Sequence, residues 1–193
     1  MSIPATITAT FSTAARRRIV LVLTALALAL TTLISPALTT TADAATAPKL
    51  TAKVTAQYAK SMLGAMNVER KWHHKKALKM NVKLIKSAHA HNLSMARANA
   101  MSHQLPGEAF FADRISKAGY NWQSAGENIG WNSDLTKNGI FYLQRVMYNE
   151  KAPNDGHRVN ILSSTYTEVG IDVYFDVKHN KVWFTQDFGQ PMR

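Results

Sequence analysis

The period of the apolar residues changes once along this 193-residue chain, and that change limits the folds open to it. Through residues 51–150, apolar side chains recur every three or four positions, which is typical of amphipathic helices. From 166 to 188 they recur at every second position, as in strands that bury one face. Lys178–Lys181 interrupts this pattern and predicts the turn of a β-hairpin. Helices followed by paired strands indicate an α+β fold with a mainly antiparallel sheet.

Four helices are expected before the hairpin, over residues 51–70, 81–100, 108–118 and 137–150. Asn81 is the expected N-cap of the second helix, and Gly119 ends the third. The pattern over residues 120–131 is weaker than that over 166–188 and predicts a strand or a loop. The clearest apolar stripe is that of the second helix, formed by Leu84, Ala88, His91, Met95 and Ala98.

The N-terminal residues have the composition of an export signal. Arg16–Arg18 precedes an apolar run over 19–30, and Ala42–Ala44 provides a small-x-small cleavage site. A retained membrane anchor is the alternative, but it needs about 20 apolar residues, and this run breaks at Thr31. We therefore expect a signal peptide over 1–44, with no transmembrane segment left after its cleavage. A Thr/Ala-rich linker and the start of the first helix follow over 45–59, and one secreted domain covers 60–190.

The net charge and the absence of Cys limit the partners and the site chemistry that are possible for this chain. The chain has 23 Lys+Arg and 12 Asp+Glu, and removal of residues 1–44 would leave 20 and 11, a net charge of +9. Much of the excess lies in Arg70–Lys76 and in Lys79, Lys83 and Lys86; it is either a solvated face or a footprint for an anionic partner. Because the chain has no Cys, disulfides, Cys-ligated zinc and a thiol nucleophile are excluded.

Four residues combine ligand-type side chains with turn-like surroundings: His103, Glu127, Glu150 and His157. Two imidazoles and two carboxylates can bind zinc, or can act as a base and an acid. Their separations of 24, 23 and 7 residues match no local metal motif. The alternative is a set of capping and hydrogen-bonding residues, in which Glu127 accepts backbone N–H bonds and His157 fixes a loop.

Several segments match the motifs of a known family and occur in that family's order. They are Asn67–Arg70, Ala88–His91, Ser102–His103, Phe111–Tyr120, Ala125–Ile129, Gly156–Leu162, Tyr166–Gly170 and Thr185–Gly189. In these segments, over about residues 60–190, the chain resembles bacterial members of the CAP superfamily (cysteine-rich secretory proteins, antigen 5 and pathogenesis-related 1), also called SCP-like.

The resemblance implies an α-β-α sandwich in which two His and two Glu line a central cleft that can bind zinc. By the family's SH, GEN and GHRxNIL motifs, it assigns His103, Glu127 and His157 to that cleft. Glu150 is similar to the fourth residue of plant and animal members, whereas bacterial members usually carry a small residue there. If Zn²⁺ binds, the resemblance makes His103 and His157 its ligands.

Three functions remain open. The first is an extracellular binding module that holds a lipid, a glycan, an anionic envelope polymer or a host-surface ligand in the cleft; nucleic acid is not expected. The second is a zinc-dependent hydrolase, protease-like or nuclease-like, that uses the same cleft. In the third, the four residues only organise the loops around the cleft. We expect a monomer.

Overall fold

The computed structural model describes residues 51–192. The expected signal peptide over 1–44, the first six residues of the expected linker (45–50) and Arg193 lie outside the described residues. None of the helices in residues 51–192 has the length and hydropathy that crossing a bilayer requires.

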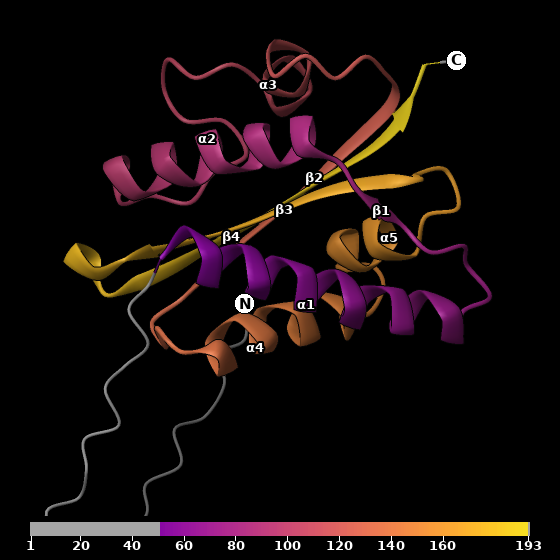
Figure 1. The fold of residues 1–193 in the computed structure, drawn as a ribbon, viewed down its shortest axis with the longest axis horizontal. Helices are drawn as coiled ribbons and strands as arrows, with labels where there is room; N and C mark the ends of the chain where they lie inside the picture. Colours follow the sequence, from indigo (N-terminus) through magenta and orange to yellow (C-terminus); the bar gives the residue numbers. More distant parts are fainter. Residues whose placement is uncertain (1–50, 193) are drawn as a thin grey trace, which may run out of the picture. The chain divides into compact units, whose positions relative to one another are not determined.

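The helices and strands form three layers, with the sheet between two layers of helices (Figure 1). The helices are α1 (Ala52–Trp72), α2 (Val82–Ala98), α3 (Phe111–Lys117), α4 (Lys137–Tyr148) and α5 (Gly156–Leu162). The strands are β1 (Lys79–Met80), β2 (Trp122–Asn132), β3 (Glu168–Asp176) and β4 (Lys181–Pro191). Helices α2 and α3 cover one face of the sheet, and α1, α4 and α5 cover the other (Figure 1). This confirms the α+β class and the α-β-α sandwich.

The sheet has the strand order β1-β3-β4-β2 and is mostly antiparallel. Only the short pairing of β1 with β3 is parallel. The predicted hairpin is confirmed as β3 and β4, which are joined by a 3₁₀ turn over Val177–His179 and by Asn180 in the left-handed region. Because β2 pairs with β4 alone, its outer side is one edge of the sheet.

The two long predicted helices are confirmed, and the shorter elements differ from expectation. Asn81 caps α2, its side chain accepting from Lys83 N at 2.9 Å. Helix α3 is shorter than predicted, and α4 ends before Glu150 rather than at it. Strand β1 and helix α5 were not predicted. The residues around His157, expected as a turn, form the first turn of α5.

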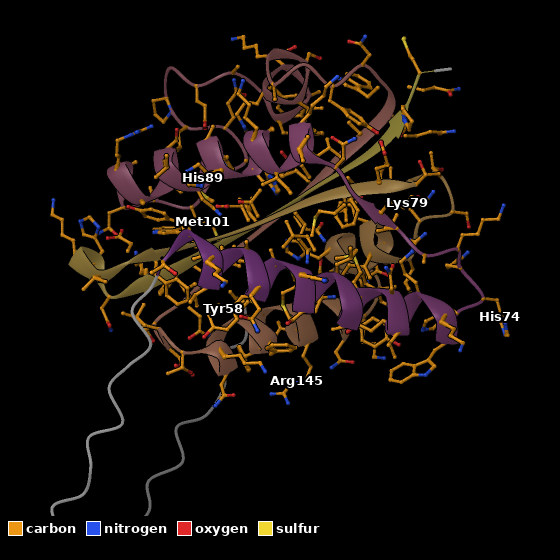
Figure 2. The ribbon with its side chains drawn as sticks, in the orientation of Figure 1. Tyr58, His74, Lys79, His89, Met101 and Arg145 are labelled. Carbon is orange, nitrogen blue, oxygen red and sulfur yellow. The ribbon has the colours of Figure 1, made fainter. Side chains whose placement is uncertain are left out.

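Burial differs between the two faces of the sheet. The face toward α1, α4 and α5 is mainly apolar and includes Val169, Val173, Phe184 and Phe188. The other face carries Glu127, Asp172, Thr185 and Asp187, of which the last three lie on the polar side of the predicted hairpin. Helix α2 covers this face, so these polar groups are largely enclosed, and a charge among them is costly unless it is paired or neutralised. Side chains occupy the layers on both sides of the sheet (Figure 2).

Gly170 sets how closely α2 approaches the sheet. A Cβ at this position would lie 2.1 Å from Leu84 C and 2.2 Å from Ile85 N, both backbone atoms of α2. Backbone atoms cannot rotate away as a side chain can, so a side chain here must push the helix off the sheet.

We expect Gly170→Ala to lower the free energy of unfolding by about 3 kcal/mol or more, because it overpacks this contact. The matched control is Gly64→Ala within α1, where an added Cβ meets nothing within 4 Å. The control should raise stability by about 0.5–1 kcal/mol, as expected for Gly to Ala in a helix. Urea denaturation followed by circular dichroism measures both, and equal effects of the two variants would contradict the close contact.

Candidate functional site

The first half of the candidate site is a buried carboxylate on β2 with a histidine over it. Nδ1 of His103, in the loop after α2, lies 2.8 Å from Oε1 of Glu127. Glu127 is buried, whereas half of the His103 side chain is exposed. The buried carboxylate of Glu127 therefore orients the imidazole of His103, whose other side is exposed to solvent.

Arg114 of α3 holds this pair in place. Its Nη2 donates to Oε2 of Glu127, and its Nη1 donates to the carbonyl groups of His103 and Ala109, at 2.9 and 2.8 Å. One guanidinium thus binds both the carboxylate and the loop that carries the histidine. Nε2 of the buried His91 lies 4.0 Å from the same Glu127 oxygen. Charge-assisted bonds of this kind compensate for the burial of Glu127.

The second half of the site comes from the opposite helical layer. Oε1 of Glu150 lies 2.5 Å from Nδ1 of His157, and Oε2 accepts from the backbone N–H of His157 at 3.0 Å. It also accepts more weakly from Arg158 N, at 3.4 Å. Glu150 therefore caps the first turn of α5 while it orients the imidazole at that turn.

The four predicted residues surround one cavity of about 460 Å³, whose wall is completed by Asn128, Asn154, Gly156 and Asn160. His103 comes from the loop joining the elements of one helical layer, and Glu150 and His157 come from the other layer. Strand β2, at the edge of the sheet, lies between them and contributes Glu127 and Asn128. The structure thus brings together four residues that the sequence separates widely.

Sequence reasoning did not single out the amide side chains of the cavity. Asn128 donates to the carbonyl of His157 at 3.2 Å and to Gln186 Oε1 at 3.0 Å. Asn160 of α5 donates to Asn128 Oδ1 at 2.9 Å. These bonds attach α5, and therefore His157, to β2 and β4. Asn128 and Asn160 both lie within the motifs that carry the family resemblance, and those motifs could have indicated them as site residues.

The sequence suggested Glu127 as a carboxylate that accepts backbone N–H bonds, but Glu150 has this role. Glu127 binds side chains, and Glu150 is the carboxylate that accepts backbone N–H bonds. In both pairs Nδ1 faces a carboxylate, so Nε2 is the nitrogen left to meet a ligand. Within residues 51–192, however, no group of three or more His, Asp or Glu side chains is arranged to hold a metal ion. The site can offer a metal two imidazoles, with the carboxylates behind them.

A second carboxyl lies behind Glu127. Asp187 of β4 is directly opposite Glu127 in the strand register and is fully buried. Among the described residues, neither of its carboxyl oxygens has a hydrogen-bond partner. Burial, and then the neighbouring Glu127 carboxylate, raise the pKa of Asp187 well above its usual range.

The chain is a three-layer α-β-α domain with paired His and Glu at the sheet edge, and comparison with known sequences assigns the family. The profile of the cysteine-rich secretory protein family, CAP, matches residues 63–188. This chain belongs to that family. The Bacillus subtilis (strain 168) protein YkwD is 28% identical over 133 residues, which are 69% of this chain and 48% of YkwD.

Solved structures share the fold. An extracellular protein with an SCP domain from Bacillus anthracis has 26% identity and a TM-score of 0.60, over 71% of this chain and 41% of that one. NaASP2, solved with Zn²⁺, has 12% identity and a TM-score of 0.52, over 72% of this chain and 83% of that one. The chain thus spans less than half the length of the two Bacillus proteins.

The raised pKa of Asp187 predicts how stability varies with pH. Because the folded state holds a proton that the unfolded chain releases near pH 4, the free energy of unfolding should fall as pH rises from there through the folded-state pKa. Asp187→Asn removes this dependence, so its stability relative to wild type should increase with pH. Asp113→Asn, at an exposed carboxyl on α3, is the control. Urea midpoints across the pH range measure the effect, and parallel curves for wild type and Asp187→Asn would contradict it.

Proposed function

We propose that this chain is a secreted CAP-domain binding module whose His/Glu cleft holds an anionic envelope component, lipid or host-surface ligand. The observation that carries the proposal is the pair of imidazoles presented from opposite helical layers into one cavity, each fixed by a carboxylate. When each ring is protonated, both of its nitrogens are donors, so Nε2 can donate to a phosphate or carboxylate group while Nδ1 donates to its glutamate.

A basic surface that reaches α5 outside the cleft supports an anionic ligand. His74, Lys75, Lys76 and Lys79, in the loop after α1 and on β1, line a depression of about 820 Å³. His74 and Lys79 lie at the same end of the fold in Figure 2. Lys75 also lines a smaller depression together with Arg158 of α5. The positive charge therefore extends from the basic loop to the helix that carries His157.

One member of the basic run has a structural role. Arg70 is buried and donates to the carbonyl groups of Lys76, Ile161 and Ser163, at 2.8, 2.7 and 2.9 Å. It stabilises the loop and the end of α5 instead of adding to the surface charge. The expected footprint is accordingly limited to the exposed part of the loop.

The experiment is cosedimentation of the chain with phosphatidylglycerol vesicles and with a purified anionic cell-wall polymer. We expect binding to one of them that persists at about 0.15 M salt, where interactions between exposed charges more than about 8 Å apart are largely screened. His103→Ala and His157→Ala should each weaken it about tenfold, because charge-assisted hydrogen bonds are lost. The control His179→Ala lies in the β3–β4 turn, away from the cleft. Absence of binding even at low salt, or equal binding by all variants, would refute the proposal.

A zinc-dependent hydrolase is the second candidate, favoured by the carboxylate behind each imidazole. Histidine ligands of metals usually donate their other ring nitrogen to such a group. His103 and His157 would hold the ion through Nε2, and Glu127 and Glu150 would hold the proton on Nδ1. A bound zinc ion would supply an activated water for hydrolysis. The relative NaASP2 was solved with Zn²⁺. Catalytic zinc usually has three protein ligands, and this cleft offers two, so we rank binding first.

Zinc titration calorimetry tests this second candidate. If zinc binds, Glu150→Gln should weaken it about 10- to 100-fold, because the amide orients the imidazole less well and makes it less basic. His157→Ala should remove the binding, and the exposed His74→Ala should leave it unchanged. Zinc affinity that does not depend on His103 or His157 would exclude the cleft as the metal site.

A further inference from the structure

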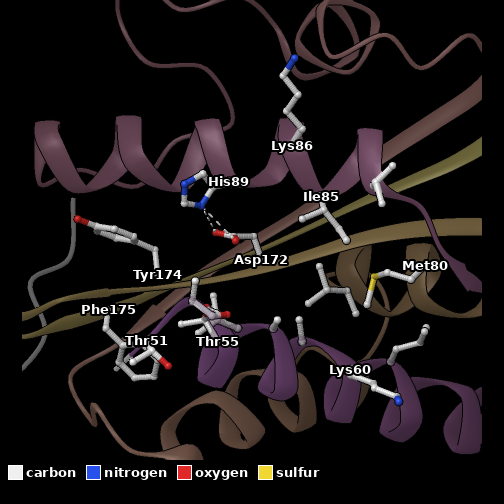
Figure 3. A pocket seen from close by; sticks show the side chains of 17 residues that line it. Thr51, Thr55, Lys60, Met80, Ile85, Lys86, His89, Asp172, Tyr174 and Phe175 are labelled. Carbon is white, nitrogen blue, oxygen red and sulfur yellow. Dashed lines mark hydrogen bonds and ion pairs between the residues drawn. The ribbon is translucent and has the colours of Figure 1, made fainter. Parts of the chain in front are cut away.

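A second cavity lies at the other edge of the sheet, away from the His/Glu cleft. It is a groove of about 810 Å³ between α1 and α2, with β3 along its floor (Figure 3). Its walls are mainly apolar and include Ala59 and Leu63 of α1 and Ile85 of α2. Neither the proposed function nor the family resemblance uses this groove.

The groove exists because β1 is short. Strand β1 pairs with β3 only at Glu168 and Val169, and the chain then turns away from the sheet at Asn81 to begin α2. Beyond Val169, no strand in residues 51–192 continues the ladder on this side of β3. Five consecutive residues of β3, 171–175, line the groove, so its floor is an open sheet edge.

Backbone acceptors face this open edge. The carbonyl groups of Thr167 and Val169 accept from Lys79 N and Asn81 N, at 3.1 and 3.0 Å. Because the direction of backbone groups repeats every second residue along a strand, the carbonyl groups of Ile171, Val173 and Phe175 point the same way. An acyl chain in the groove would take these acceptors out of water without bonding them, whereas an extended peptide would bond them.

The charge at the groove favours an acidic occupant. Lys60 lies on the α1 wall and Lys86 on the α2 wall (Figure 3). Asp172 also lines the groove, but its carboxylate is already bound by His89 Nδ1 at 3.2 Å and by Asn92 Nδ2 at 2.8 Å. Both side chains extend away from the groove floor in Figure 3, so their ammonium groups lie at its rim, where they complement acidic side chains that extend past the walls.

We propose that this groove binds an extended peptide with acidic side chains, which adds as a strand to the open edge of β3 beside β1. The open stretch of five residues is about 17 Å long and fits a peptide strand of about that many residues. Alternate side chains of the peptide would face the apolar walls formed by α1 and α2, and acidic ones would reach the lysines.

The probe is a random heptapeptide library displayed on phage and selected on the chain. The blocking variant is Ala56→Trp, which fills the groove from the exposed surface of α1. The matched control is Gln57→Trp, one residue along the same helix at an exposed position outside the groove. We expect acidic peptides to be enriched on wild type and on Gln57→Trp, and their affinity for Ala56→Trp to be at least tenfold lower.

The backbone bonding is tested on the peptide itself. N-methylation of every second residue in a selected peptide should weaken binding at least tenfold in one register and have little effect in the other, since only one set of N–H groups faces β3. The proposal is overturned if no peptide is enriched over the Ala56→Trp variant, or if both methylated registers bind equally. It is also overturned if oleate-containing vesicles, and no peptides, bind in a manner that Ala56→Trp blocks.

Discussion

The ion pair between Arg114 and Glu127 is the interaction on which the candidate site depends. Glu127 is buried on the edge strand β2, and Arg114 reaches it from α3 while also binding the carbonyl of His103. The pair therefore couples a strand, a helix and the loop that carries a functional histidine. Removing one member of a buried pair usually costs about 3–5 kcal/mol, because the other is left as an uncompensated charge. The position of His103 and the stability of the fold are thus linked in one contact.

The carboxylates in the two halves of the cleft are stabilised in different ways. Glu127 is enclosed by the protein and balanced by Arg114, whereas Glu150 is partly exposed and balanced by the N–H groups at the start of α5. Each carboxylate fixes an imidazole through Nδ1, so the two rings present the same atom, Nε2, from opposite helical layers. Placing the cleft at the edge strand lets both layers reach it without opening the sheet.

Much of the fold could be predicted from the sequence because periodicity is a local signal. The alternation over 166–188 predicted the β3–β4 hairpin, and the stripe through Leu84 and Met95 predicted α2. Helix α5 was missed because its start is capped by Glu150, which lies outside the helix, and Asp155 at its N-cap makes no side-chain capping bond. Strand β1 was missed because it has two residues. The enclosure of Asp187 depends on α2 packing against Gly170, and no local pattern contains that contact. Residue type and turn-like surroundings suggested the grouping of His103 with His157, and the motif resemblance assigned both to one cleft, since their spacing carries no signal.

The central claim is that a carboxylate holds Nδ1 of both cleft imidazoles and leaves Nε2 for a ligand. Long-range proton–nitrogen NMR correlations, assigned by His103→Ala and His157→Ala, report the tautomer of each ring at a pH where both are neutral. The account predicts that both rings carry their proton on Nδ1, and that Glu127→Gln and Glu150→Gln each disturb this in their own partner. Rings that carry the proton on Nε2, or that respond to neither glutamate, would contradict it.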